Sequence, residues 1–128
     1  KQQLKVVCAA LNEIVNISYE AFIENDIKKA YKVEPLEQLI DDLKEKMRSS
    51  HIARLKAGEC SIEAGFVWSD LLTNIERVAD HCENIALCVI DSNAMNMNAH
   101  EALRALKKSN PDFDAQYKEF SEKYFINF

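Results

Sequence analysis

Residues 74–86 have the sequence Asn74-Ile75-Glu76-Arg77-Val78-Ala79-Asp80-His81-Cys82-Glu83-Asn84-Ile85-Ala86 and lie in the longest periodic run of the chain. Apolar residues recur in this run at intervals of three or four: Trp68, Leu71, Leu72, Ile75, Val78, Ala79, Cys82, Ile85, Ala86 and Val89. This spacing places them on one face of a helix. We therefore predict a helix over residues 61–91, with Ser61 as its N-cap.

Two further segments have the same periodicity. The first covers residues 2–24, with Leu4, Val7, Cys8, Leu11, Ile14, Val15, Ser18 and Phe22 on one face, and the second covers residues 27–56, with Val33, Leu36, Ile40, Leu43 and Met47. Asn25 and Asp26 predict a turn and a helix cap between them. Gly58 suits the left-handed position that ends the second helix, whereas Pro35 should kink that helix or restart it.

The fold class follows from these long segments. The 128 residues include only two glycines and two prolines, so turns are few. We predict an all-α protein, an antiparallel three-helix bundle over residues 1–91. Residues 92–128 are predicted to be a linker, a short helix over residues 99–108 and a last helix from Asn110-Pro111. The aromatic face of this last helix should pack on the bundle, or else remain exposed for a partner: Phe113, Tyr117, Phe120 and Tyr124.

Composition excludes several functions. The net charge of −5 argues against nucleic-acid binding. No apolar run approaches the roughly 18 residues of a membrane span. Because the chain has no Gly-rich phosphate loop, no Glu-x-x-His sequence and no recognisable nucleophile arrangement, we expect no enzyme. The four cysteines are expected to be reduced and mostly buried, and His51 and His100 to be ordinary surface residues.

Acidic residues four positions apart are candidate metal ligands, because they share a helix face. Five such pairs occur, so position must choose among them: Glu20/Glu24, Glu37/Asp41, Asp41/Glu45, Glu59/Glu63 and Glu76/Asp80. In a hairpin about Gly58, Glu37 faces the level of Asp80, and Asp41 faces the level of Glu76. These four carboxylates should therefore cluster in one groove, with Asn84 and His81 as possible supporting groups.

Clustered carboxylates need positive charge among them. A multivalent cation with oxygen ligands, such as Mg²⁺, Ca²⁺, Mn²⁺ or iron, is one source. Salt bridges from Arg77, Lys44 or Arg48 are the other, and spacing alone favours salt bridges.

The sequence Glu76-Arg77-Val78-Ala79-Asp80-His81, followed by Asn84-Ile85-Ala86, resembles the signature of the phosphate-uptake regulator family PhoU. Residues 33–43 resemble the second helix of the same family more loosely, and the resemblance covers about residues 1–91. It implies metal binding on the bundle surface by Glu37, Asp41, Glu76 and Asp80, with Fe, Mn, Zn or Mg as the ion. PhoU proteins contain two three-helix repeats, whereas this chain has one.

The tail, residues 99–125, resembles the end of bacterial sodium/phosphate cotransporter-like proteins, which carry a PhoU-like domain after their membrane part. This resemblance implies a cytoplasmic regulatory domain of a bacterial cell-membrane protein, with the transporter part of the same parent as its partner. It would also account for a chain that starts with Lys1. The alternative is a structural module that forms homo-oligomers or docks on the parent, with its acidic residues merely solvated.

Overall fold

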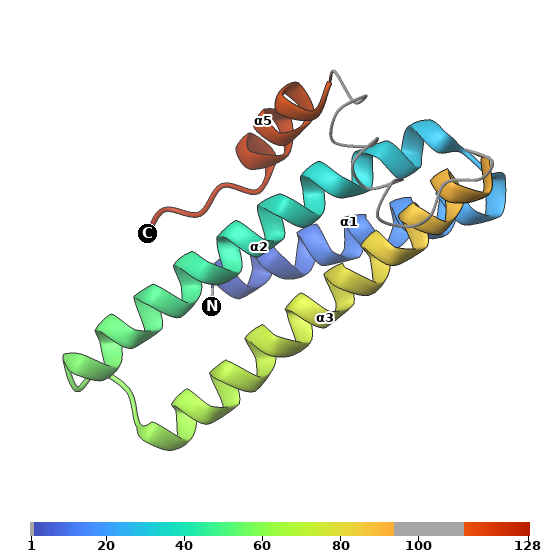
Figure 1. The fold of residues 1–128 in the computed structure, drawn as a ribbon. Helices are drawn as coiled ribbons and strands as arrows, with labels where there is room; N and C mark the ends of the chain where they lie inside the picture. The colour runs from blue at the N-terminus through green and yellow to red at the C-terminus, as the bar shows by residue number, and fades with distance from the viewer. Residues whose placement is uncertain (1, 94–111) are drawn as a thin grey trace.

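The computed structural model describes residues 2–93 and 112–128, which form helices and no strand. Three long helices follow one another in alternating directions: α1 (Gln2–Glu24), α2 (Ile27–Lys56) and α3 (Ile62–Asn93), so α2 is antiparallel to both α1 and α3 (Figure 1). A shorter helix, α5 (Phe113–Lys123), lies along α2. The all-α prediction is confirmed. The helix expected over residues 99–108 lies outside the described residues, as does His100.

Local sequence signals account for the ends of the long helices. Asp26 caps α2 by accepting a hydrogen bond from the backbone nitrogen of Lys29 at 3.3 Å, and Asn25 before it is left-handed, with φ 53°. Gly58 is also left-handed, with φ 72°, and Ser61 Oγ accepts a hydrogen bond from the nitrogen of Ala64 at 3.1 Å. These two short turns hold the three helices in their antiparallel arrangement.

Pro35 does not interrupt α2. It is buried in the interior of the helix, which continues from Ile27 to Lys56 as one element, so the predicted restart is wrong. Pro35 lies among buried neighbours that include Val33, Leu36 and Leu39. Packing of this kind offsets the lost backbone hydrogen bond of a helical proline.

The apolar face of α1 is wider than the bundle can cover. Val7, Ala10, Ile14, Ser18 and Ala21 face the core, whereas three residues of the predicted face are exposed: Cys8, Val15 and Phe22. By length and composition alone α1 could cross a membrane, since its most apolar 18-residue window has a mean hydropathy of 1.4 and is 28% buried. This finding runs against the expectation that no apolar segment reaches that length, although a core helix passes the same test.

Two expectations about single residues are also wrong. His51 is buried rather than on the surface. All four cysteines are free as expected, but Cys8 and Cys88 are exposed and Cys60 is half-buried, leaving only Cys82 in the core.

The aromatic face of α5 packs on the bundle. Phe120 and Tyr124 are buried, the Tyr124 hydroxyl donates a hydrogen bond to Glu13 of α1, and the Tyr117 hydroxyl donates one to Asp42 of α2. Burial and these hydrogen bonds raise the pKa of both tyrosines to about 12. The described helix begins at Phe113, directly after Asp112. Asn110 and Pro111, where the sequence placed its start, lie outside the described residues.

Candidate metal centre

The groove between α2 and α3 brings acidic side chains of both helices together. The two helices lie side by side along most of their length (Figure 1). Asp41 Oδ1 on α2 and Glu76 Oε2 on α3 are each 3.0 Å from Lys44 Nζ. The register counted from Gly58 therefore places Asp41 and Glu76 at one level.

Lys44 supplies the positive charge at this end of the groove. Its side chain is only 5% exposed, and Nζ also lies 3.3 Å from Glu45 Oε1. Burial alone would lower the pKa of Lys44, but hydrogen bonds to Asp41, Glu76 and Glu45 outweigh burial and raise it. A buried, charged lysine thus occupies the space between Asp41 and Glu76, as in the salt-bridge alternative.

A second acidic group lies further along the same groove. Glu34, Glu37 and Glu83 each place one carboxylate oxygen within 4.8 Å of the other two. Glu34 is buried, and Glu37 and Glu83 are half-buried. No described lysine or arginine forms an ion pair with Glu37 or Glu83, so these two carboxyl groups lack the compensation that Lys44 provides for Asp41 and Glu76.

The pKa of Glu37 is raised by its position in this group. Burial first, and then the charge of Glu83 and a hydrogen bond with it, raise the pKa of Glu37 to about 9, with smaller contributions from Glu34 and Asp41. These effects favour a proton shared within the Glu37–Glu83 pair. A bound proton reduces the repulsion among the three carboxyl groups and so allows them to lie close together.

Asp80 is influenced by the charges of both acidic groups, the Lys44-bound pair and the three-carboxylate group. Partial burial and the charges of Glu76, Glu83 and Asp41 raise its pKa, and Lys44 opposes them. Of the four predicted ligands, Asp41 and Glu76 are paired with Lys44, and Glu37 belongs to the three-carboxylate group. Asp80 is exposed and belongs to neither set.

The remaining predicted residues are peripheral. His81, Asn84 and Arg77 are exposed on α3, and Arg77 forms no ion pair with any described residue.

Sequence reasoning missed Glu34 and Glu83. Glu34 precedes Glu37 by three residues, and Glu83 follows Asp80 by three, so both lie on the same helix faces as the predicted ligands. A search for acidic residues three as well as four positions apart would have found them.

The three-carboxylate group suits a hard cation. Oxygen ligands lie about 2.0–2.6 Å from Mg²⁺ or Ca²⁺, so two oxygens bound to one ion are separated by up to roughly 5 Å. The oxygens of Glu34, Glu37 and Glu83 are already within that separation. A cation would have to displace the proton of Glu37, so its binding would release a proton.

Comparison with known proteins assigns the chain to a family. The PhoU domain matches residues 5–89. A curated relative, "Phosphate-specific transport system accessory protein PhoU homolog 1" of Thermotoga maritima, is 26% identical over 114 residues, which are 89% of this chain but 49% of the relative. The chain thus spans about half the length of that relative, and no solved structure matches it significantly. The PhoU match covers both helices of the acidic groove and most of the residues around it, so the chain belongs to the PhoU family.

Proposed function

We propose that this chain is a non-enzymatic regulatory domain of phosphate transport whose α2–α3 groove binds a metal ion. Family membership and the printed name of the Thermotoga maritima relative, an accessory protein of a phosphate-specific transport system, support the regulatory role. The observation that carries the metal proposal is the convergence of one carboxylate oxygen each from Glu34, Glu37 and Glu83 to within 4.8 Å of one another.

The proposed mechanism is an exchange of a proton for a cation. Glu34 and Glu37 belong to α2 and Glu83 belongs to α3, so an ion bound to all of them joins the two helices. Such an ion stabilises the arrangement in which the helices are close, relative to any arrangement that separates the carboxylates. Iron, Mn²⁺, Zn²⁺ and Mg²⁺ are the candidate ions, and the all-oxygen ligand set favours Mg²⁺, Mn²⁺ or iron.

The proposed parent is a sodium-dependent phosphate transporter-like protein of a bacterial cell membrane. The resemblance of residues 99–125 to the ends of such proteins supports this parent. The domain would then lie on the cytoplasmic side and relay phosphate status to the membrane part of the same protein. Its effect on transport is measured as phosphate uptake in the native cell, with and without substitutions in the acidic groove.

We expect that replacing both Glu37 and Glu83 by glutamine will abolish tight metal binding. The double substitution keeps the shape of the group and removes two of its three carboxylates. Calorimetric titration of the chelator-treated protein with Mn²⁺, Fe²⁺, Zn²⁺ and Mg²⁺ measures the binding. Saturating metal should also raise the melting temperature of the unsubstituted protein, since an ion at about 100 times its Kd adds about 2.7 kcal/mol to the free energy of unfolding.

The matched control is the double substitution Glu59→Gln with Glu63→Gln, an exposed acidic pair near the hairpin turn. It removes the same number of carboxyl groups and should bind metal as the unsubstituted chain does. The same metal titration of a chain with Asp41→Asn and Glu76→Asn tests the Lys44-bound pair separately. Because the metal is assigned to the three-carboxylate group, this chain should still bind it. If none of the ions produces heat or a change in melting temperature with the unsubstituted protein, the metal proposal fails.

A second candidate function, docking without metal, is supported by an apolar surface on α1 and α3. Tyr19 and Phe22 are each 62% exposed, and they line an apolar depression of about 350 Å³ with Val15, Ser18, Cys82 and Ile85. We propose a second copy of this chain as the occupant. The Thermotoga maritima relative has about as much chain again beyond the aligned part, which supports a second domain of similar size beside the first.

On this proposal, Phe22→Ser should convert a dimer into a monomer. Removing one exposed phenyl ring from each side of the contact costs about 2 kcal/mol of association energy at each site. Light scattering during size-exclusion chromatography measures the mass across a range of protein concentrations. Val67→Ser, at an exposed valine near the other end of α3, is the control and should leave the dimer intact. A monomeric unsubstituted chain at every concentration, or binding of this face to lipid vesicles alone, contradicts the proposal.

A further inference from the structure

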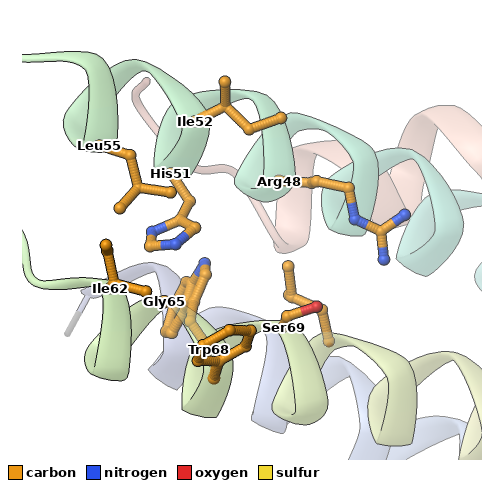
Figure 2. Close-up of a pocket in the computed structure, with 10 residues that line it drawn as sticks. Arg48, His51, Ile52, Leu55, Ile62, Gly65, Trp68 and Ser69 are labelled. Atoms are coloured by element: carbon orange, nitrogen blue, oxygen red, sulfur yellow. The ribbon is translucent and has the colours of Figure 1, made fainter.

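A cavity of about 350 Å³ lies between α2 and α3, near the hairpin turn and away from the acidic groove. Figure 2 shows side chains of α2 and α3 facing one another across it, with His51 projecting from α2 toward Gly65 and Trp68 of α3. Most of its wall is apolar, from Ile52, Leu55, Ile62, Phe66 and Leu72. None of the acidic-groove residues lines it.

His51 lines the cavity, and one of its ring nitrogens has no hydrogen-bond partner among the described residues. The residue is 8% exposed, its Nδ1 lies 3.9 Å from Cys60 Sγ, and Nε2 has no hydrogen-bond partner among the described residues. Gly65 makes room for the ring, because a Cβ atom at this position would lie 3.1 Å from Nε2. A buried polar atom without a partner destabilises the folded chain, so this part of the molecule is not optimised for stability alone.

Trp68 provides a second such nitrogen on the facing helix. Its Nε1 is buried with no hydrogen-bond partner in the part of the chain that the structure describes, and Figure 2 shows this nitrogen directed toward α2. An indole N–H only donates hydrogen bonds, so its missing partner must be an acceptor. The ring centroids of His51 and Trp68 are 6.3 Å apart, so the two aromatic rings form one part of the wall.

The charged residues of the lining indicate that the hydrogen-bond acceptor of a ligand would be an anion. Arg48 and Ser69 complete the described lining, which includes a cation and no carboxylate. The existing partner of Arg48 is Glu45, at 3.5 Å and on the exposed side of α2, which is a weak surface ion pair. The guanidinium can therefore turn to a ligand anion at low cost.

We propose that this cavity binds a small organic carboxylate with an apolar body. The aliphatic and aromatic walls take the body of the ligand, and the carboxylate accepts hydrogen bonds from Arg48, Ser69 and Trp68. The exposed side chains of Ile52 and Phe66 lie where the cavity meets solvent. This site does not depend on metal binding in the acidic groove.

The test uses 4-phenylbutyrate as the probe and 4-phenylbutan-1-ol as its uncharged match. Trp68 is the sole tryptophan of the chain, so its fluorescence reports on the cavity directly. In the presence of a chelator, the acid should change this fluorescence saturably, with a Kd of about 1 mM or below, and the alcohol should bind at least about tenfold more weakly. Equal binding of both compounds, or no saturable change with either up to about 10 mM, overturns the proposal.

Substitutions then locate the bound carboxylate. Arg48→Gln should weaken binding of the acid about tenfold and leave binding of the alcohol unchanged, because a charge-assisted hydrogen bond is lost. Lys46→Gln, at an exposed lysine of the same helix that does not line the cavity, is the matched control and should change neither affinity. Trp68→Phe, followed by calorimetry, should weaken the acid several-fold. An Arg48→Gln chain that melts normally and binds the acid with full affinity overturns the proposed recognition.

Discussion

Replacing Lys44 by methionine should lower the free energy of unfolding by about 2 kcal/mol, although methionine is the more apolar residue. Lys44 Nζ is the shared partner of Asp41, Glu76 and Glu45, and without it these carboxylates face one another across the α2–α3 groove. They are each about half exposed, so water compensates for part of the loss. Chemical denaturation of the chelator-treated protein measures the difference.

The control for Lys44→Met is Lys46→Met, which removes an exposed charge two residues away and should change stability by no more than about 0.5 kcal/mol. If the groove binds cations, the stability of the Lys44→Met chain should recover as Mn²⁺ or Mg²⁺ is added, because the ion replaces the lost positive charge. A Lys44→Met chain as stable as the unsubstituted one would contradict the role given to this lysine.

Replacing Glu37 by glutamine should stabilise the metal-free protein at pH 8 by about 1 kcal/mol or more. The pKa of Glu37 is raised from 4.5 to about 9 by burial and by Glu83, so the folded chain binds more protons than the unfolded chain between these values. The stability that Glu37 contributes is thus fully present below pH 4.5 and is lost as the pH rises toward 9. Glutamine mimics the protonated carboxyl and removes this dependence.

The measurement compares unfolding free energies of the two proteins from pH 5 to pH 8.5 in the presence of a chelator. The difference between them should grow with pH and nearly vanish near pH 4.5, the unfolded pKa. Glu59→Gln, at an exposed glutamate, should follow the unsubstituted protein throughout. If the free energies of unfolding of the Glu37→Gln and unsubstituted proteins change with pH in the same way, the pKa of Glu37 is the same in the folded and unfolded states, which contradicts the prediction.

The helix boundaries, and the position of Asp41 opposite Glu76, were predictable because they depend on signals that are close together in the sequence. Asp26, Gly58 and Ser61 fix where helices begin and end. With α2 uninterrupted at Pro35, counting residues outward from Gly58 is enough to place Asp41 opposite Glu76. Periodicity and capping depend on neighbours in sequence, so one sequence suffices to read them.

The partners of individual side chains were not predictable in the same way. Helical spacing gave Val15 and Phe22 the same face as Ile14, but the line along which α1 meets α2 and α3 is narrower than that face. The burial of His51 depends on the absence of a side chain at Gly65 on the facing helix. Contacts of this kind depend on the separation and rotation of two helices, which periodicity leaves open.

The central position of α2 limits how this domain can respond to a signal. It is packed by α1, α3 and α5, and it contributes residues to both the acidic groove and the His51 cavity (Figure 1). A sliding movement of α2 would disrupt contacts with all three neighbours at once. Both sites lie between α2 and α3, so an occupant of either one would stabilise the contact between the same two helices.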